Sequence, residues 1–354
     1  MQKKLIALAI ASLVSAPVFA QSQVSVYGVI DVGVEFAKFN STDGNINRMI
    51  TSGNTTNRIG FKGTEDLGNG LKANFVLEGQ PDPDVGTHNS GGAFWHRTST
   101  VGLSSNSWGS VNLGSQYTPW FSARAANDIF YTAGSGSNYN FESGDTRMSN
   151  SIRYDSPSMS GFSVAVMYGF GELGGVYGAQ EGLTTATDKQ GRSVGLNLAY
   201  ANGPLAVRYA YDSQTITQGP DVDMERNHVN GSYDFKVVKI VAGWNSNKLD
   251  TGATDNRSWY LGGVMPVFGK DLIKLEYTDW NDKTATAATG SKDAKMIALG
   301  YEHPMSKRTT LYATYSKLSN DSGAARGFLT GAGNSAVALG FDPSSFQMGL
   351  KHSF

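Results

Sequence analysis

Hydrophobic and polar residues alternate with a period of two along most of the chain after residue 20. In the first such stretch, Val24, Val26 and Ile30 fall on one face, whereas Ser25 and Asp31 fall on the other. The alternation returns in segments 71–78, 162–168, 194–200, 207–212, 238–244, 273–277, 297–301 and 311–315. A period of two is that of a β-strand, and faces that differ this consistently indicate one apolar and one polar environment. Since no run of about 18 apolar residues follows residue 20, we expect strands, not transmembrane helices.

The connections between these stretches alternate in length. Short turns occupy residues 66–70, 201–204, 269–271 and 304–307, and long polar stretches occupy 40–56, 169–191, 213–226, 246–256, 281–292 and 319–334. Alternating short and long connections are typical of an all-β, up-and-down antiparallel barrel that spans a membrane, with short periplasmic turns and long outer loops. A hairpin repeat of about 40 residues predicts sixteen strands, and eighteen would require shorter loops.

The first twenty residues have the pattern of a secretory signal peptide. Lys3 and Lys4 precede an apolar stretch over residues 5–14, and residues 18–20 resemble a cleavage site. This segment is too short for a membrane-spanning helix, which needs about 20 apolar residues. We therefore expect a cleaved signal peptide over residues 1–20 and a single barrel domain over residues 21–354.

Composition excludes several classes of protein. The chain has 43 glycines, 16 tyrosines, 17 phenylalanines and no cysteine, and 17% of its residues are charged. Abundant aromatics and few charges argue against disorder, and the lack of cysteine excludes disulfides and thiol redox sites. The formal net charge of −1 gives no basic footprint for nucleic acid. A soluble β-sandwich would also alternate, but the many aromatics at the ends of the apolar faces favour a membrane interface.

The sequence offers no catalytic or metal-binding motif. Its five histidines are scattered, and none lies in a hydrolase or metalloprotease motif. His88 and His96 are eight residues apart in one polar stretch with Asp82 and Asp84 nearby, which is a poor pattern for a metal site. We therefore predict neither an enzyme nor a metal or cofactor site.

The C-terminus and four internal segments resemble one known family. Residues 346–354 alternate in polarity and end on Lys-His-Ser-Phe, and further similarity lies in segments 23–31, 57–71, 111–119 and 150–157. Together they resemble Gram-negative outer-membrane general diffusion porins of the β-proteobacterial and neisserial branch. The resemblance implies a homotrimer of sixteen-stranded barrels whose third outer loop folds into the lumen. It also implies that the barrel-assembly machinery recognises Phe354 as an assembly signal.

A protein of this kind is a passive diffusion channel for small hydrophilic solutes and ions across the outer membrane, in contact with lipid and lipopolysaccharide. Its selectivity depends on the width of the pore and the charges at its constriction. The third loop, about 117–150, is the longest stretch without alternation, and the family places arginines on the wall opposite it. We therefore assign to the constriction the loop residues Arg124, Glu142, Asp145 and Arg147 and the wall residues Arg58, Arg97 and Arg153.

Departures from the family pattern keep other functions open. Ser115 stands where the family commonly has an arginine, so one wall charge is missing. A substrate-specific channel for sugars or anions would need an aromatic track, which Trp95, Trp120, Phe121, Phe130 and Tyr131 could supply. A surface adhesin or receptor that uses the long outer loops is a further alternative.

Overall fold

The structure is a computed structural model that describes residues 23–39, 45–88, 92–141, 146–171, 191–217, 221–286, 290–330, 333–334 and 337–354. The expected signal peptide lies outside these residues. None of the helices in the described ranges is long and apolar enough to cross a membrane.

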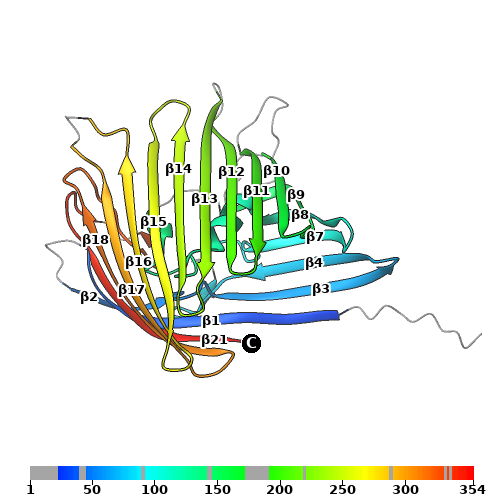
Figure 1. Ribbon diagram of the computed structural model, residues 1–354, viewed down its shortest axis with the longest axis horizontal. Helices are drawn as coiled ribbons and strands as arrows, with labels where there is room; N and C mark the ends of the chain where they lie inside the picture. Colours follow the sequence, from blue (N-terminus) through cyan, green and yellow to red (C-terminus); the bar gives the residue numbers. More distant parts are fainter. Residues whose placement is uncertain are drawn as a thin grey trace, which may run out of the picture.

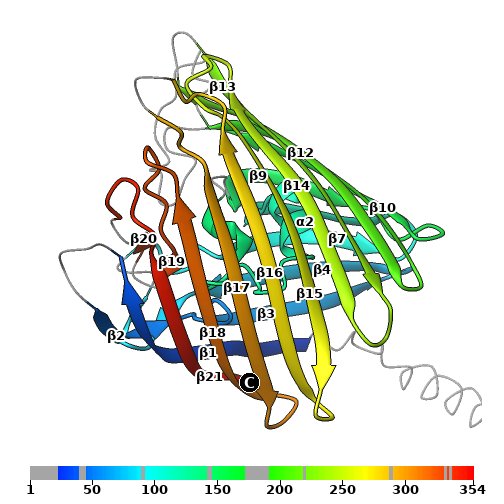
Figure 2. The ribbon, with the colours of Figure 1, turned by 60° about the vertical axis from the view of Figure 1, so that its left-hand side comes forward.

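The main sheet of the described residues is antiparallel and closes on itself (Figures 1 and 2). Each strand of the ring pairs with the next, and the last strand pairs back to the first, with Val32 opposite Leu350. The sheet has seventeen strands among the described residues, of which sixteen form the closed barrel. The strands of the ring are β1 (Gln23–Lys38), β3 (Arg58–Gly68), β4 (Leu71–Gly79), β7 (Thr98–Ser105), β8 (Gly109–Tyr117), β9 (Arg147–Asp155), β10 (Phe162–Phe170), β11 (Arg192–Asn202), β12 (Leu205–Thr217), β13 (Val222–Asp234), β14 (Lys239–Leu249), β15 (Asp255–Val267), β16 (Asp271–Asp282), β17 (Ala294–Pro304), β18 (Thr309–Asn320) and β21 (Ser344–Ser353). The prediction of a sixteen-stranded barrel is confirmed.

The seventeenth strand lies inside a segment that the sequence predicted to be a loop. Strand β2 (Ile46–Thr51) pairs with the C-terminal half of β1, and β3 pairs with the N-terminal half of β1 along the same edge. Between β2 and β3 the chain is not paired with β1 as a strand. There the carboxylate of Asp31 accepts hydrogen bonds from the backbone N–H groups of Asn54 and Thr55 at 2.9 and 2.6 Å. The buried Asp31 thereby satisfies backbone groups that the interrupted ladder leaves unpaired.

The two faces of the wall differ as the alternation predicted. Along β17 every second residue is buried, and Ile297, Leu299 and Tyr301 between them expose their side chains on the outside. The interior face instead carries polar residues such as Asp31 and Glu302, which are buried. An apolar outside and a polar inside are the pattern of a membrane barrel and the reverse of a soluble sandwich.

The two ends of the barrel differ in their connections. One end has tight turns, such as the turn at Asn69 and Gly70 between β3 and β4, where both residues have positive φ. The other end has the longer loops, two of which contain the short hairpins β5 (Pro81–Asp82) with β6 (Thr87–His88) and β19 (Leu329–Thr330) with β20 (Gly333–Asn334). We refer to these as the short-turn end and the long-loop end.

The last residue closes the barrel at the short-turn end. The backbone N–H and carbonyl of Phe354 each pair with Gly28 of β1 at 3.1 Å. The ring of Phe354 lies against Gly28 so closely that a Cβ atom there would be 2.3 Å from its Cζ. Gly28 is therefore required for the close approach of the terminal phenylalanine to the first strand.

Candidate functional site: the constriction

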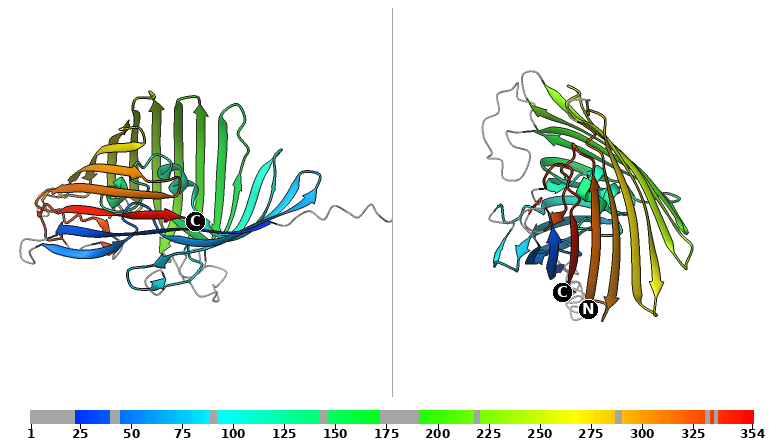
Figure 3. Two further views of the ribbon diagram at one scale, coloured as in Figure 1. Left: turned by 90° about the horizontal axis from the view of Figure 1, so that it is seen from below. Right: turned by 90° about the vertical axis from the view of Figure 1, so that its left-hand side faces the viewer.

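The third long connection leaves the wall after Tyr117, and its described residues 118–141 fold into the barrel (Figure 3). It opens with helix α2 (Pro119–Ala125), in which the hydroxyl of Thr118 caps the helix by accepting the N–H of Phe121 at 3.1 Å. A threonine cap followed by proline at the first helical position is a strong helix start. The helix packs against β11, β12 and β13 and buries Trp120 completely. The predicted infolding of the third loop is confirmed.

The tip of this loop is attached to the opposite part of the wall. The backbone N–H of Ser135 donates to Oε1 of Gln347 at 3.0 Å, and its hydroxyl lies 3.2 Å from that of Ser316. Gly134 has a φ of 63°, and a Cβ atom at this position would lie 2.0 Å from the carbonyl oxygen of Gly53. Only glycine fits at this position, and it allows the loop to approach the wall closely. The hydrogen bonds of Ser135 then hold the tip in a defined position across the barrel.

Three of the predicted arginines line one cavity of about 290 Å³ beside the loop. Arg58 is the first residue of β3, Arg97 directly precedes β7, and Arg147 is the first residue of β9. Phe121, Thr132 and Tyr139 of the loop also line this cavity, which we call the arginine cavity. The three arginines are distant in sequence, but the closed sheet brings them together in the lining of the arginine cavity.

The three guanidinium groups differ in how their charge is balanced. Arg97 is 2% exposed, and its Nε donates to Glu78 at 2.7 Å, so a carboxylate neutralises it. Arg58 donates from Nε and Nη2 to the carbonyl oxygen of Thr56, at 3.2 Å each. Arg147 donates at 2.7 Å to the carbonyl oxygen of Arg97. These carbonyl oxygens orient the guanidinium groups of Arg58 and Arg147.

Tyr117, the last residue of β8, holds two of these arginines. Its phenol oxygen accepts a hydrogen bond of 2.6 Å from Nη2 of Arg97 and another of 2.6 Å from Nη2 of Arg147. One face of its ring stacks on Phe121, with centroids 5.1 Å apart, and Cζ of Arg147 lies 4.3 Å from the ring centroid. No signal in the sequence pointed to a functional role for Tyr117, because its two arginine partners are distant along the chain or on another strand.

Arg153 is placed differently from the other wall arginines. Its Nε and Nη2 bind the carboxylate of Asp155 at 2.9 and 2.7 Å. Its Nη1 donates to the carbonyl oxygen of Tyr117 at 2.6 Å and to the hydroxyl of Ser122 at 3.1 Å. It does not belong to the described lining of the arginine cavity. Arg153 therefore fixes the start of the loop, and Asp155 balances its charge.

The remaining predicted residues fall into two groups. Arg124 is fully buried within the loop, where its Nη2 donates to Oδ1 of Asn138 at 2.6 Å and its Cζ lies 4.5 Å from the ring centroid of Tyr139. It thus connects α2 to the 3₁₀-helix η2 (Asn138–Phe141). Glu142 and Asp145 lie outside the described residues, and their place at the constriction stays a prediction.

The missing wall charge at Ser115 leaves a hydroxyl pair in its place. Ser115 Oγ lies 3.3 Å from Ser149 Oγ, near a bulge in the pairing of β8 with β9. Two residues away on β9, Arg147 points its guanidinium at Tyr117. This part of the wall therefore carries the positive charge of Arg147, at a different position from Ser115.

The proposed aromatic track is mostly buried. Phe121 and Phe130 are nearly inaccessible, as is Trp120, because the loop packs these rings against the wall or against each other. Tyr131 is 40% exposed and is the most accessible of the four track residues that lie in the loop. These four residues therefore form no continuous exposed track.

His96 lies beside the arginine cluster, in the connection that precedes β7. Burial, together with the neighbouring positive charges of Arg147 and Arg97, lowers the pKa of its imidazole to about 4. His96 is therefore neutral at pH 7, and it adds no charge to the cluster.

The sequence matches known proteins along its whole length. The model of the Gram-negative porin family matches residues 7–323. Outer membrane porin protein 32 of Delftia acidovorans is 34% identical over 100% of both chains. The major outer membrane protein P.IB of Neisseria lactamica is 27% identical, also over 100% of both chains.

Solved structures agree with this similarity. The anion-selective porin from Comamonas acidovorans has a TM-score of 0.79 and 32% identity, and the match covers 94% of this chain and 100% of that one. OmpT of Vibrio cholerae, in a structure described as a trimer form, has a TM-score of 0.66 at 17% identity, over 94% of this chain and 99% of that one. The second likeness is one of fold alone.

Proposed function

Because this chain belongs to the Gram-negative porin family, we propose that the arginine cavity is the constriction of its outer-membrane channel and that it favours small anions. The protein is a passive diffusion channel of the outer membrane, a role that involves no covalent chemistry. Selectivity in such a channel depends on the width of the passage and on the sign of its charge.

The carrying observation is the uneven charge balance at the arginine cavity. The described lining of this cavity includes Arg58, Arg97 and Arg147 and no acidic residue, and Arg97 is paired with Glu78 behind the lining. A passage with a lining of this sign has a positive potential, which raises the local concentration of anions. The anion-selective porin from Comamonas acidovorans, a structural relative, supports the same sign.

The test is the reversal potential across a planar bilayer under a KCl gradient. Arg58→Ser and Arg147→Ser should each shift it toward cation preference, and the double variant should shift it most. The shift should fade toward 1 M salt, where the Debye length falls from about 10 Å to about 3 Å. An unchanged reversal potential in the double variant at 0.1 M salt would contradict the proposal.

Two matched variants show whether position matters. Arg308→Ser removes an equal charge from an exposed turn at the short-turn end and should leave the reversal potential nearly unchanged. Arg153→Ser should shift it less than Arg147→Ser, because Arg153 does not belong to the described lining of the arginine cavity. Glu142→Lys and Asp145→Lys should strengthen anion preference if these residues lie at the constriction.

A substrate-specific channel is the second candidate, since this same structural relative is selective for anions. The two alternatives differ in liposome swelling with neutral sugars of increasing size. General diffusion predicts a smooth decline of rate with size, whereas one sugar that enters much faster than its size allows would favour a specific channel.

Assembly and export are part of the proposal. We propose a homotrimer, supported by the trimeric OmpT structure of similar fold, with the apolar outer face against lipid and lipopolysaccharide. A cleaved signal peptide over residues 1–20 and recognition of Phe354 by the barrel-assembly machinery complete it. N-terminal sequencing of the mature protein should begin at Gln21, and crosslinking in native membranes should give a three-subunit species.

A further inference from the structure

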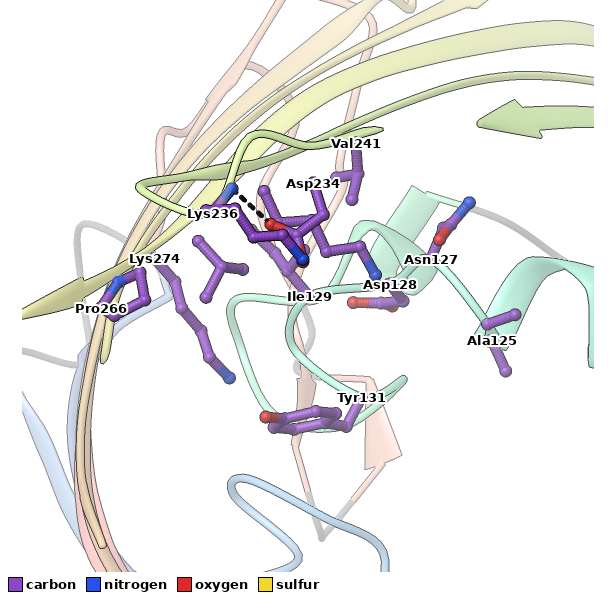
Figure 4. A pocket seen from close by; sticks show the side chains of 13 residues that line it. Ala125, Asn127, Asp128, Ile129, Tyr131, Asp234, Lys236, Val241, Pro266 and Lys274 are labelled. Atoms are coloured by element: carbon purple, nitrogen blue, oxygen red, sulfur yellow. Dashed lines mark hydrogen bonds between the residues drawn. The ribbon is translucent and has the colours of Figure 1, made fainter. Parts of the chain in front are cut away.

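A second cavity, of about 330 Å³, lies between loop residues 125–131 and the wall from β13 to β16 (Figure 4). It shares no lining residue with the arginine cavity. Its wall includes the turn between β13 and β14, which belongs to the short-turn end. We call it the lateral cavity.

Two lysines of this cavity have uncommitted ammonium groups. In the described part of the chain, the side chains of Lys236 and Lys239 make neither a hydrogen bond nor an ion pair. Lys274, the third lysine, is paired with Glu302 on the neighbouring strand. Figure 4 shows Lys236 and Lys274 extending from the wall toward the loop.

The acidic residues of the lateral cavity leave a surplus of positive charge. Asp128 is buried in the loop, where its carboxylate accepts the hydroxyl of Ser137 and the N–H of Phe130 and faces Arg124. Among the described residues that line the cavity, Asp234 alone remains to balance the two uncommitted lysines. Within this lining one positive charge is therefore left over, which suits an anionic ligand.

The rest of the lining is apolar. Ile129 of the loop and Val241, Val264 and Pro266 of the wall border the cavity, together with Tyr131. A surface of this composition with a few convergent polar groups is typical of small-molecule sites, which begin at about 300 Å³. An inorganic anion would use the lysines alone and leave the apolar surface in contact with water.

Two lining residues adopt a backbone conformation that glycine usually provides. Lys236 has a φ of 73° and Tyr131 a φ of 59°. The carboxylate of Asp234 holds Lys236 in this turn by accepting its backbone N–H at 2.7 Å. Left-handed conformations of such residues are strained and persist where the surroundings impose them, often at functional sites.

We propose that the lateral cavity binds small organic carboxylates with an apolar body, the carboxylate contacting Lys236 and Lys239 and the body contacting Ile129, Val264 and Tyr131. Its place at the short-turn end makes it accessible from the periplasmic side. The proposal rests on the channel function, but it is independent of any anion preference at the arginine cavity.

The experiment measures the chloride current through the reconstituted channel while sodium benzoate is added to one side and then to the other. Benzoate bound beside the loop should reduce the current along a saturating curve, with a lower half-saturating concentration from the periplasmic side than from the other side. Lys236→Ser combined with Lys239→Ser should raise the half-saturating concentration by about tenfold or more, as expected for the loss of charged hydrogen bonds.

Lys307→Ser combined with Arg308→Ser is the matched control, since it removes two positive charges from another exposed turn at the same end. It should leave the half-saturating concentration unchanged. An equal rise of the half-saturating concentration in both double variants would show that general surface charge, not this site, attracts benzoate. A non-saturating response of the wild type would overturn the proposed site outright.

Acetate tests the apolar part of the site. It should require a higher concentration than benzoate, because it has almost no body to contact Ile129 and Val264, and equal concentrations would overturn that assignment. The reversal potential in KCl without benzoate tests the arginine cavity separately, so the failure of one proposal is distinguishable from the failure of the other.

Discussion

The phenol oxygen of Tyr117 and Nη2 of Arg147 are 2.6 Å apart, and the two residues are direct partners across β8 and β9. Strand β8 leads into the third long connection, and strand β9 follows it. The contact thus joins both ends of the loop and aims a guanidinium group at the arginine cavity.

Tyr117→Phe tests this arrangement. The ring stack with Phe121 should persist, but Arg97 and Arg147 lose a common acceptor whose hydrogen bonds are worth about 1.5–3 kcal/mol each. We expect a reversal potential that shifts toward cation preference by less than in Arg147→Ser, with larger fluctuations of the open-channel current. A Tyr117→Phe channel identical to wild type in both respects would show that the phenol does not position Arg147.

The outer face of the barrel should not tolerate charge. Leu299 lies in the middle of β17 and exposes its side chain outward, so Leu299→Arg should destabilise the barrel by about 2–4 kcal/mol. Asn74→Arg on the inner face of β4 is the control and should cost much less. Urea unfolding in lipid vesicles gives both values, and equal midpoints would contradict the assignment of faces.

Deletion of Phe354 should impair closure of the barrel. It removes both backbone hydrogen bonds to Gly28, a loss of about 1–3 kcal/mol, together with the aromatic contact at that glycine. The yield of heat-modifiable barrel in membranes should fall, whereas Phe354→Tyr should retain most of it. A normal yield in the deletion strain would argue against both the closing role and the assembly signal.

Acidification should weaken the folded protein through His96. Its pKa is about 4 in the fold and about 6.5 in an unfolded chain, so the unfolded state binds the proton more readily between these values. Stability is complete above pH 6.5 and declines as the pH falls toward 4, by roughly 2 kcal/mol at pH 5. His96→Gln should remove this part of the difference between the unfolding midpoints at pH 7 and pH 5. The same difference in wild type and variant would exclude His96 as its cause.

Much of the fold could be predicted from the sequence, because a barrel wall between lipid and a polar interior requires apolar and polar residues to alternate along each strand. A residue such as Leu299 must face lipid and one such as Glu302 must face inward, and this local rule needs no knowledge of distant partners. The same rule missed β2, whose residues alternate too briefly to be distinguished from the loop around them.

The candidate site was predictable in part. Alternation and family resemblance placed Arg58 and Arg97 on the inner wall, and both line the arginine cavity. Neither could show that Glu78 neutralises Arg97, or that Arg153 binds Asp155 and the loop while Arg147 lines the cavity. Alternation fixes the face of a side chain, but it says nothing of the partner that the side chain meets.

The sequence by itself therefore determined which face of each strand is apolar, where the chain turns, and that the third connection is too long to be a simple loop. Only the tertiary structure decided the path of that connection. Its position depends on contacts such as Asn127 with Asn230 and Ser135 with Gln347, which join residues more than 100 positions apart. Such contacts exist only once the barrel has closed, because closure brings these strands within reach of the loop.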